Sequence, residues 1–354
     1  KSLADSRLAD GLGKLFLEYK WKKRDIAVYY SFDSMYTAFL IGPETRSFQM
    51  LKDSALSNYY KGRQNLQYLL EGLLYQYDFV SYDQVSKGIL KDYKTLIMPS
   101  VLSMSDAEVK AVNEFIKSGG TVIADLEPAG YDELACKRPA TPLEQVTVLG
   151  SVFDDKDSAM CNAIAMQLAQ AALKPIVTVD APLPGREAMH FVDDDMHLFA
   201  VLRDPYIADD DATQTITLPV KGHLYDLRKR AYLGVTDTVT TQIPHNQAVV
   251  FGVYPYQVKA LRIKMPPKVQ AGTDLKAALE IVPSAGKAGK HVFHIEVRNP
   301  KGKANILMRR NKIAENGKMD FAFRIAHNDV AGTWTLRVTD ILSGIVTEQP
   351  FTVK

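Results

Sequence analysis

Several polar side chains fall at the ends of predicted strands in the first half of the chain: Ser31, Asp33, Ser100, Asp125, Glu127 and Tyr131. Open parallel sheets bind ligands at the carboxyl ends of their strands, so these residues are candidates for a ligand crevice. Asp125 and Glu127 would serve as general acid and base if their environments separated their pKa values. The alternative is that the crevice is a remnant or packs against another domain.

The residues around these positions favour neither a cofactor nor a metal. The loop at residues 31–37 lies where a flavodoxin holds phosphate, but it lacks a glycine that would let backbone amides approach an anion. The acidic runs at 193–195 and 209–211 lack the spaced oxygen ligands and the glycine of a calcium loop. No histidine pairs with a carboxylate at helical metal spacing. We therefore expect no cofactor and no bound metal.

Strands and helices alternate over residues 25–181, which predicts an α/β domain with a parallel sheet and helices on both faces. Strands are expected at 26–30, 79–82, 95–98, 121–125, 146–152 and 176–179, and helices at 65–77 and 159–173. Ser105 and Glu108 form a capping box at the start of a further helix, which Gly119 and Gly120 end.

The hydrophobic period changes to two after residue 182, which predicts two all-β domains. Short strands within 182–264 indicate an antiparallel β domain, and a proline-rich hinge follows at 265–267. The segment 265–354 has the strand spacing of an immunoglobulin-like sandwich, with Trp334 in its core, and we expect it to fold independently.

Residues 1–24 are predicted to be a leader helix belonging to an upstream domain, because leucines recur in them at helical spacing. The chain has a net charge of +2 and contains no apolar run long enough to span a membrane. Its basic residues are scattered among strands without a recognition motif beside them, so we expect no nucleic-acid partner. Cys136 and Cys161 are too few for a disulfide framework and are interpreted as free thiols, with one disulfide as the alternative.

Four ordered motifs carry a family resemblance: residues 24–31, 77–81, 93–99 and 115–124. They resemble the trimerisation domain of family 42 β-galactosidases, itself similar to class I glutamine amidotransferases, over roughly residues 20–180. The resemblance implies a flavodoxin-like sheet, a homotrimer and an upstream catalytic barrel. Residues 189–254 are similar to the β domains that end many glycoside hydrolases, and residues 331–344 resemble immunoglobulin-like modules of exported bacterial proteins.

The amidotransferase nucleophile is missing from its expected place. That chemistry needs a cysteine on a strained turn after the Gly-Gly-strand unit, where this chain has Asp125, Leu126 and Glu127. We therefore expect a non-catalytic C-terminal region of a multidomain glycoside hydrolase, periplasmic or extracellular. The alternative is a stand-alone, catalytically silent protein that binds a saccharide; an independent hydrolase using the two carboxylates is the weakest hypothesis.

Apolar side chains in two segments suggest self-association. Leu8, Leu12, Leu15 and Phe16 of the leader would be exposed without an upstream domain, and Tyr59 and Tyr60 lie in a long connection. A homo-oligomer is therefore expected, with the trimer number implied by the resemblance alone. The alternative is that these segments fold back on the chain itself.

Overall fold

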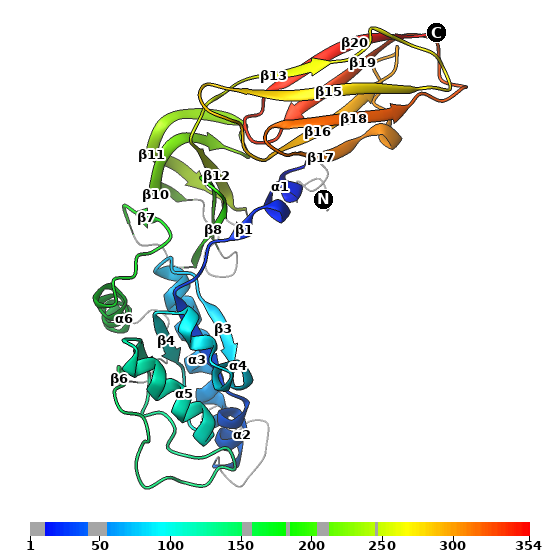
Figure 1. The fold of residues 1–354 in the computed structure, drawn as a ribbon. Helices are drawn as coiled ribbons and strands as arrows, with labels where there is room; N and C mark the ends of the chain where they lie inside the picture. The colour runs from blue at the N-terminus through cyan, green and yellow to red at the C-terminus, as the bar shows by residue number, and fades with distance from the viewer. Residues whose placement is uncertain (1–10, 42–54, 151–157, 182–184, 204–211, 245–246) are drawn as a thin grey trace.

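The computed structural model describes residues 11–41, 55–150, 158–181, 185–203, 212–244 and 247–354. Figure 1 shows an α/β part at one end, an antiparallel sheet in the middle and a two-sheet sandwich at the other end. Among the described residues, no helix is long and apolar enough to cross a membrane. The predicted combination of a parallel sheet with antiparallel β sheets is confirmed.

The α/β part is a five-stranded parallel sheet with the order β3-β2-β4-β5-β6. Its strands are β2 (Ile26–Tyr30), β3 (Asp78–Ser81), β4 (Thr95–Met98), β5 (Thr121–Ala124) and β6 (Thr147–Val148). Its helices are α2 (Phe32–Leu40), α3 (Ala55–Gly72), α4 (Tyr82–Ser86), η2 (Ile89–Asp92), α5 (Asp106–Lys117) and α6 (Ser158–Gln170).

Alternate residues of each parallel strand enter different cores, so helices cover both faces of the sheet. Val28 and Ile123 pack with α3 and α6 in one core, whereas Tyr29 and Ala124 pack with α4 and α5 in the other. Side chains alternate between the two faces of a β-strand, and here both faces of the sheet are buried. The expected capping box is confirmed, because Ser105 and Glu108 make both reciprocal bonds at the start of α5.

The middle sheet has seven strands, with the order β1-β8-β9-β12-β10-β11 and β7 beside β10. The strands are β1 (Lys20–Trp21), β7 (Thr178–Val179), β8 (Arg186–Asp193), β9 (Met196–Arg203), β10 (Ala212–Asp226), β11 (Ala231–Ile243) and β12 (Val249–Tyr254). The sequence assigned the strand at 176–179 to the α/β domain. That assignment is wrong for β7, because it pairs antiparallel with β10 and joins the middle sheet.

The terminal sandwich packs a three-stranded sheet on a five-stranded one, with the orders β13-β15-β18 and β14-β20-β19-β16-β17. The strands are β13 (Val258–Lys264), β14 (Lys268–Val269), β15 (Asp274–Pro283), β16 (His291–Arg298), β17 (Arg310–Ala314), β18 (Lys318–Arg324), β19 (Gly332–Asp340) and β20 (Val346–Val353), with η3 (Ile306–Met308). Trp334 is 2% exposed, which confirms its place in the sandwich core.

The strand β13 changes the expected division between the two β domains. It pairs antiparallel with β15 from Val258 to Lys264, so it belongs to the sandwich although the sequence placed it in the preceding domain. A strand is stabilised mainly by the neighbouring strands to which it hydrogen bonds, so its pairing decides the domain to which it belongs. We therefore propose a boundary near residue 256 in place of residue 265.

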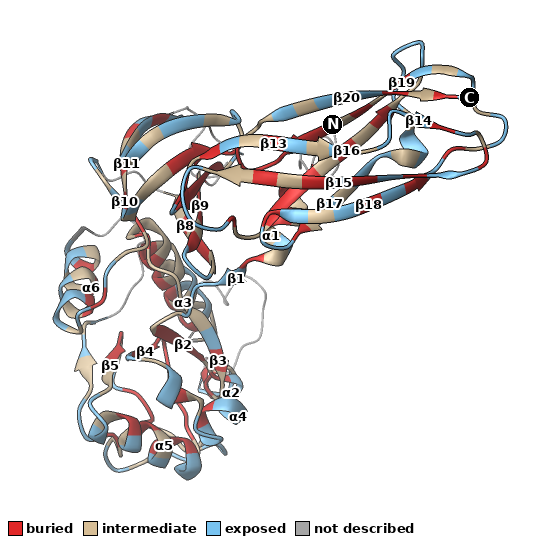
Figure 2. Cartoon of the chain, turned by 45° about the horizontal axis from the view of Figure 1, so that its top comes forward, coloured by how far each residue is buried: buried red, intermediate tan, exposed pale blue. Residues whose placement is uncertain are grey.

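The leader folds back on the chain. The helix α1 (Leu12–Glu18) contacts β16, and β1 pairs with β8. Leu12 and Leu15 are 6% and 0% exposed and share one core with the sandwich, so the expectation that they are exposed is wrong. Residues 1–10, including Leu8, lie outside the described residues. Figure 2 shows the buried side of α1 facing the β domains.

A buried polar network joins the middle sheet to the sandwich. His291 Nδ1 lies 2.8 Å from Asp340 Oδ1 and neither side chain has exposed area, while His291 Nε2 lies 2.9 Å from the Tyr256 hydroxyl. Asp340 also accepts hydrogen bonds from the Ser343 amide (3.0 Å) and hydroxyl (2.5 Å). Beside it, the hydroxyls of Tyr19 and Tyr254 hydrogen bond to each other.

We expect His291→Ala to lower the free energy of unfolding by about 2 kcal/mol or more, because it empties a buried site and removes the hydrogen bonds that join His291 to Asp340 and Tyr256. The measurement is the denaturant midpoint. His327→Ala, at an exposed site of the same sandwich, is the control and should change stability by about 0.5 kcal/mol or less. Equal effects of the two variants would contradict the role of the network.

Candidate functional site

Ser100 and Asp125 meet at the carboxyl ends of β4 and β5. Asp125 is 6% exposed, and it accepts hydrogen bonds from the Ser100 amide (2.6 Å) and the Ser100 hydroxyl (2.9 Å). Ser100 has a φ of 52°, a left-handed conformation that costs a serine free energy. Burial raises the pKa of Asp125, and the hydrogen bonds from Ser100 oppose that rise. The carboxylate therefore stabilises a strained turn.

Ser31 is also held by local structure. It is the N-cap of α2, where its hydroxyl accepts a hydrogen bond from the Ser34 amide (3.0 Å) and donates one to the Ser103 carbonyl (3.3 Å). The Ser103 hydroxyl lies 2.5 Å from that of Thr37. These buried bonds tie α2 to the loop that follows β4.

The remaining candidates have different surroundings. Asp33 is half-buried, and burial together with the nearby Glu108 and Glu133 raises its pKa. Glu127 is exposed, and Tyr131 is half-buried and bridges to Ser103 through its backbone. Among the described residues, no hydrogen bond or ion pair joins Asp125 to Glu127. Ligand binding by these residues stays a prediction.

Glu108 is a buried carboxylate that the sequence assigned only to helix capping. It is 1% exposed and accepts hydrogen bonds from the Ser105 amide (2.7 Å) and hydroxyl (2.6 Å) and from the Tyr29 hydroxyl. Burial and this carboxylate raise the pKa of Tyr29. The hydrogen bond from Tyr29 to Glu108 joins α5 to β2.

The turn after β5 does not have the backbone of a nucleophile elbow. Left-handed non-glycine residues near this edge are Ser100 and Ala129, whereas residues 125–127 have negative φ. Cys136 and Cys161 are free thiols, exposed and half-buried respectively. Among the described residues, no group of His, Cys, Asp and Glu has the arrangement of a metal site. Asp193 forms an ion pair with Lys290, and residues 209–211 lie outside the described residues.

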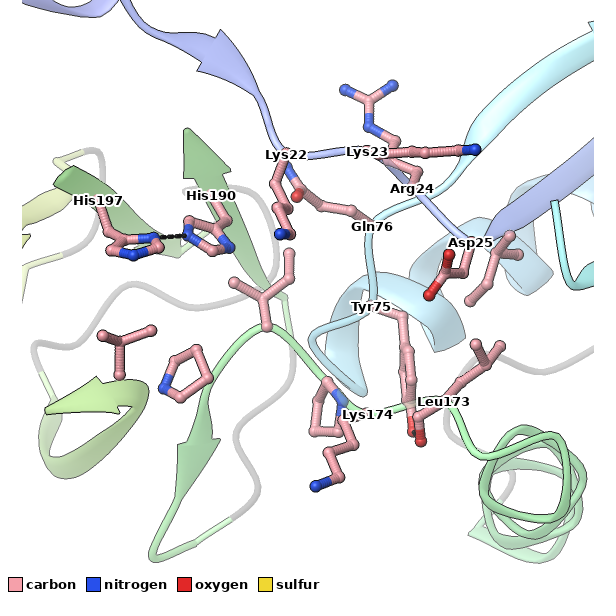
Figure 3. A pocket seen from close by; sticks show the side chains of 15 residues that line it. Lys22, Lys23, Arg24, Asp25, Tyr75, Gln76, Leu173, Lys174, His190 and His197 are labelled. Carbon is pink, nitrogen blue, oxygen red and sulfur yellow. Dashed lines mark hydrogen bonds between the residues drawn. The ribbon is translucent and has the colours of Figure 1, made fainter. Parts of the chain in front are cut away.

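A second hollow, which sequence reasoning missed, lies between the α/β part and the middle sheet. This junction pocket is a cavity of about 300 Å³, and Figure 3 shows its lining side chains. His190 and His197 form one wall, with 3.0 Å between His190 Nε2 and His197 Nδ1. They lie on β8 and β9, paired through a tight turn at Asp194 and Asp195. The register pairs His190 with Phe199 and His197 with Val192, so the two histidines are diagonal neighbours on adjacent strands. Two histidines on either side of a short acidic turn were the available sequence signal.

Both imidazoles of the junction pocket are held neutral. Burial lowers the pKa of His190 to about 3, with His197 and Lys22 adding to the effect. Burial also lowers the pKa of His197, again with Lys22 beside it and with Asp195 opposing. The pair therefore donates and accepts hydrogen bonds as neutral rings at neutral pH.

Comparisons with known proteins give partial similarities. No family model matches the sequence, and no curated protein matches it. The apo exo-carrageenase of family GH42 from Bacteroides ovatus is 14% identical with a TM-score of 0.43, covering 66% of this chain and 29% of that one. A catalytic mutant of Gan42B, a GH42 β-galactosidase from G. stearothermophilus, is 10% identical with a TM-score of 0.49, covering 66% and 40%. The chain thus spans well under half the length of these structures.

We expect Asp125→Ala to destabilise the fold by about 2 kcal/mol, because the Ser100 amide and hydroxyl lose their buried acceptor. Thermal and denaturant unfolding measure this loss. Glu127→Ala is the matched control at an exposed carboxylate in the same turn and should change stability by about 0.5 kcal/mol or less. Indistinguishable stabilities would show that Asp125 does not hold the turn.

The histidine pair predicts a loss of stability in acid. A folded-state pKa of about 3 lies below the unfolded value of about 6.5, so the unfolded chain binds a proton first as pH falls. His190 therefore destabilises the fold progressively below about pH 6.5, by up to about 2 kcal/mol at pH 5. His190→Gln should flatten the stability profile between pH 7 and 5, whereas the exposed-site variant His327→Gln should leave it unchanged. Equal slopes of stability against pH for the unmodified chain and His190→Gln would refute this prediction.

Proposed function

We propose that the chain is a non-catalytic C-terminal region of a multidomain glycoside hydrolase, similar to a β-galactosidase, that supports a catalytic barrel and assembles oligomers. The observation that carries the proposal is the Asp125–Ser100 contact at the place of the amidotransferase nucleophile. There, both carboxylate oxygens are occupied by the turn itself. The position of the nucleophile therefore holds a carboxylate that stabilises a turn, in place of the cysteine that glutaminase chemistry requires.

The strand order supports the domain assignment. Numbered along the chain, the strands of the parallel sheet run 2-1-3-4-5, the order of flavodoxin-like folds. The four motifs that resemble the trimerisation domain contribute β2, β3, β4 and the α5–β5 unit, and so supply four of the five strands of this sheet. An exported location, periplasmic or extracellular, belongs to the proposal because the terminal module resembles modules of exported bacterial proteins.

An aromatic surface on the α/β part supports self-association. We define it as Tyr30, Phe32, Tyr60, Arg63 and Phe79. Phe32 and Phe79, each 43% exposed, pack edge-on against Tyr30 at centroid distances of 5.1 and 6.3 Å. The Arg63 guanidinium lies 4.8 Å from the Tyr30 ring and 5.6 Å from that of Tyr60. Aromatic residues and arginine are enriched in protein interfaces, where they contribute much of the binding energy.

The decisive experiment measures mass and activity on the same sample. Light scattering at micromolar concentration should give an oligomer, with a trimer as the number implied by the resemblance. The double variant Phe32→Lys and Phe79→Lys should lower the mass to that of the monomer, because it places charges in the proposed interface. Leu17→Lys, at a 78% exposed site on α1, is the control and should keep the oligomer.

Two outcomes would overturn the proposal. A strictly monomeric unmodified chain would remove the assembly role and favour the stand-alone saccharide-binding alternative. Turnover of glutamine or of a nitrophenyl galactoside, abolished by Asp125→Ala, would remove the non-catalytic assignment. Circular dichroism of each variant shows whether the fold is retained.

A further inference from the structure

The junction pocket contains positive charge that the protein does not neutralise. Lys22, Lys23, Arg24 and Lys174 line it. Arg24 pairs with Asp78, and Lys23 lies 4.0 Å from Asp92. Among the described residues, no ion pair or side-chain hydrogen bond is formed by the ammonium group of either Lys22 or Lys174.

The carboxylate that lines this pocket does not cancel these charges. Asp25 pairs with Lys94, at 2.9 Å, and so is already neutralised. In Figure 3 the Lys22 side chain extends toward His190 and His197, whereas Lys23 and Arg24 point away from that pair. Lys22 therefore supplies positive charge beside the histidine wall, whereas the Lys174 side chain extends away from that wall.

The histidine wall adds a hydrogen-bond donor. A neutral imidazole carries one N–H, and the His190–His197 bond uses one of the two N–H groups. In either tautomeric arrangement, the pair retains one N–H outside that bond. An N–H donor beside an unpaired ammonium is a suitable environment for an oxyanion.

Apolar side chains complete the walls. Tyr75 and Leu173 come from the loops after α3 and α6, and Val220 comes from β10. The cavity of about 300 Å³ lies at the small end of the range for small-molecule sites. These walls match the carbon body of one small molecule rather than a polymer.

We propose that the junction pocket binds a small organic oxyanion, a carboxylate or a sulfate or phosphate ester, with Lys22 neutralising the charge and the histidine pair donating its remaining N–H to it. The walls come from both the α/β part and the middle sheet, so the bound anion joins these two parts. Binding then stabilises their arrangement through mass action, since the unfolded chain has no such pocket.

Calorimetric titration of the full chain at constant ionic strength tests the proposal. Glucuronate and galactose 6-sulfate are the organic probes, sulfate and phosphate are the inorganic ones, and galactose is the neutral control. We expect the organic anions to bind and to raise the melting temperature with concentration, and galactose to do neither. Lys22→Gln should weaken binding at least tenfold, whereas Lys23→Gln, whose charge points away from the histidine pair, should retain affinity.

A second readout follows the imidazoles directly. The charged groups acting on the pair are Lys22 and, for His197, also Asp195. A bound anion opposes Lys22, so NMR should show the pKa of both histidines rising when glucuronate is added. The same titration of Lys22→Gln should show a much smaller change.

Several results would overturn the inference. Absence of binding would contradict the proposed site. Equal losses of affinity for Lys22→Gln and Lys23→Gln would contradict it as well. Binding of sulfate and phosphate without either organic anion would remove the assignment of an organic ligand. These results concern anion affinity, whereas the proposed assembly role is tested by mass, so one can fail while the other stands.

Discussion

The buried contact between His291, Asp340 and Tyr256 is the constraint on which the arrangement of the β domains depends. Neither the histidine nor the carboxylate has exposed area, so each relies on the other and on Tyr256 and Ser343 for its hydrogen bonds. Tyr256 lies in the connection between β12 and β13, so its bond to His291 fixes this connection against the sandwich. The two β parts therefore share one core and are held by a polar contact that fits only one arrangement.

Tyr19 extends this constraint to the start of the chain. Its hydroxyl bonds to Tyr254 beside the network, and its neighbours Leu12 and Leu15 enter the same core. Once Tyr19 is fixed, β1 pairs with β8 and the chain passes directly through Lys22 into β2. The backbone amide of Lys22 donates a hydrogen bond to the His190 carbonyl, so the anchored leader places the Lys22 side chain beside the histidine pair.

Features determined by neighbouring residues could be predicted from the sequence, and features determined by distant contacts could not. The parallel strands, the Ser105–Glu108 capping box and the burial of Trp334 follow from short-range periodicity and cap chemistry. The sheet to which β13 belongs and the pairing of β7 with β10 depend on partners far along the chain. Periodicity shows that such a segment is a strand but does not identify its sheet.

The candidate sites also combine features that neighbouring residues determine with features that distant contacts determine. Parallel topology predicts that Ser100 and Asp125 lie close together, but the sequence does not show that both carboxylate oxygens accept hydrogen bonds from Ser100. The pairing of His190 with His197 needed the β8–β9 register, and its proximity to Lys22 needed the position of the leader. Buried polar groups that hydrogen bond to one another stabilise a fold. A charged group without a partner beside a cavity can still form a favourable interaction with a ligand. By that criterion the hydrogen bonds of Asp125 stabilise its turn, and the ammonium of Lys22, unpaired among the described residues, is the charge that supports the proposal of anion binding at the junction pocket.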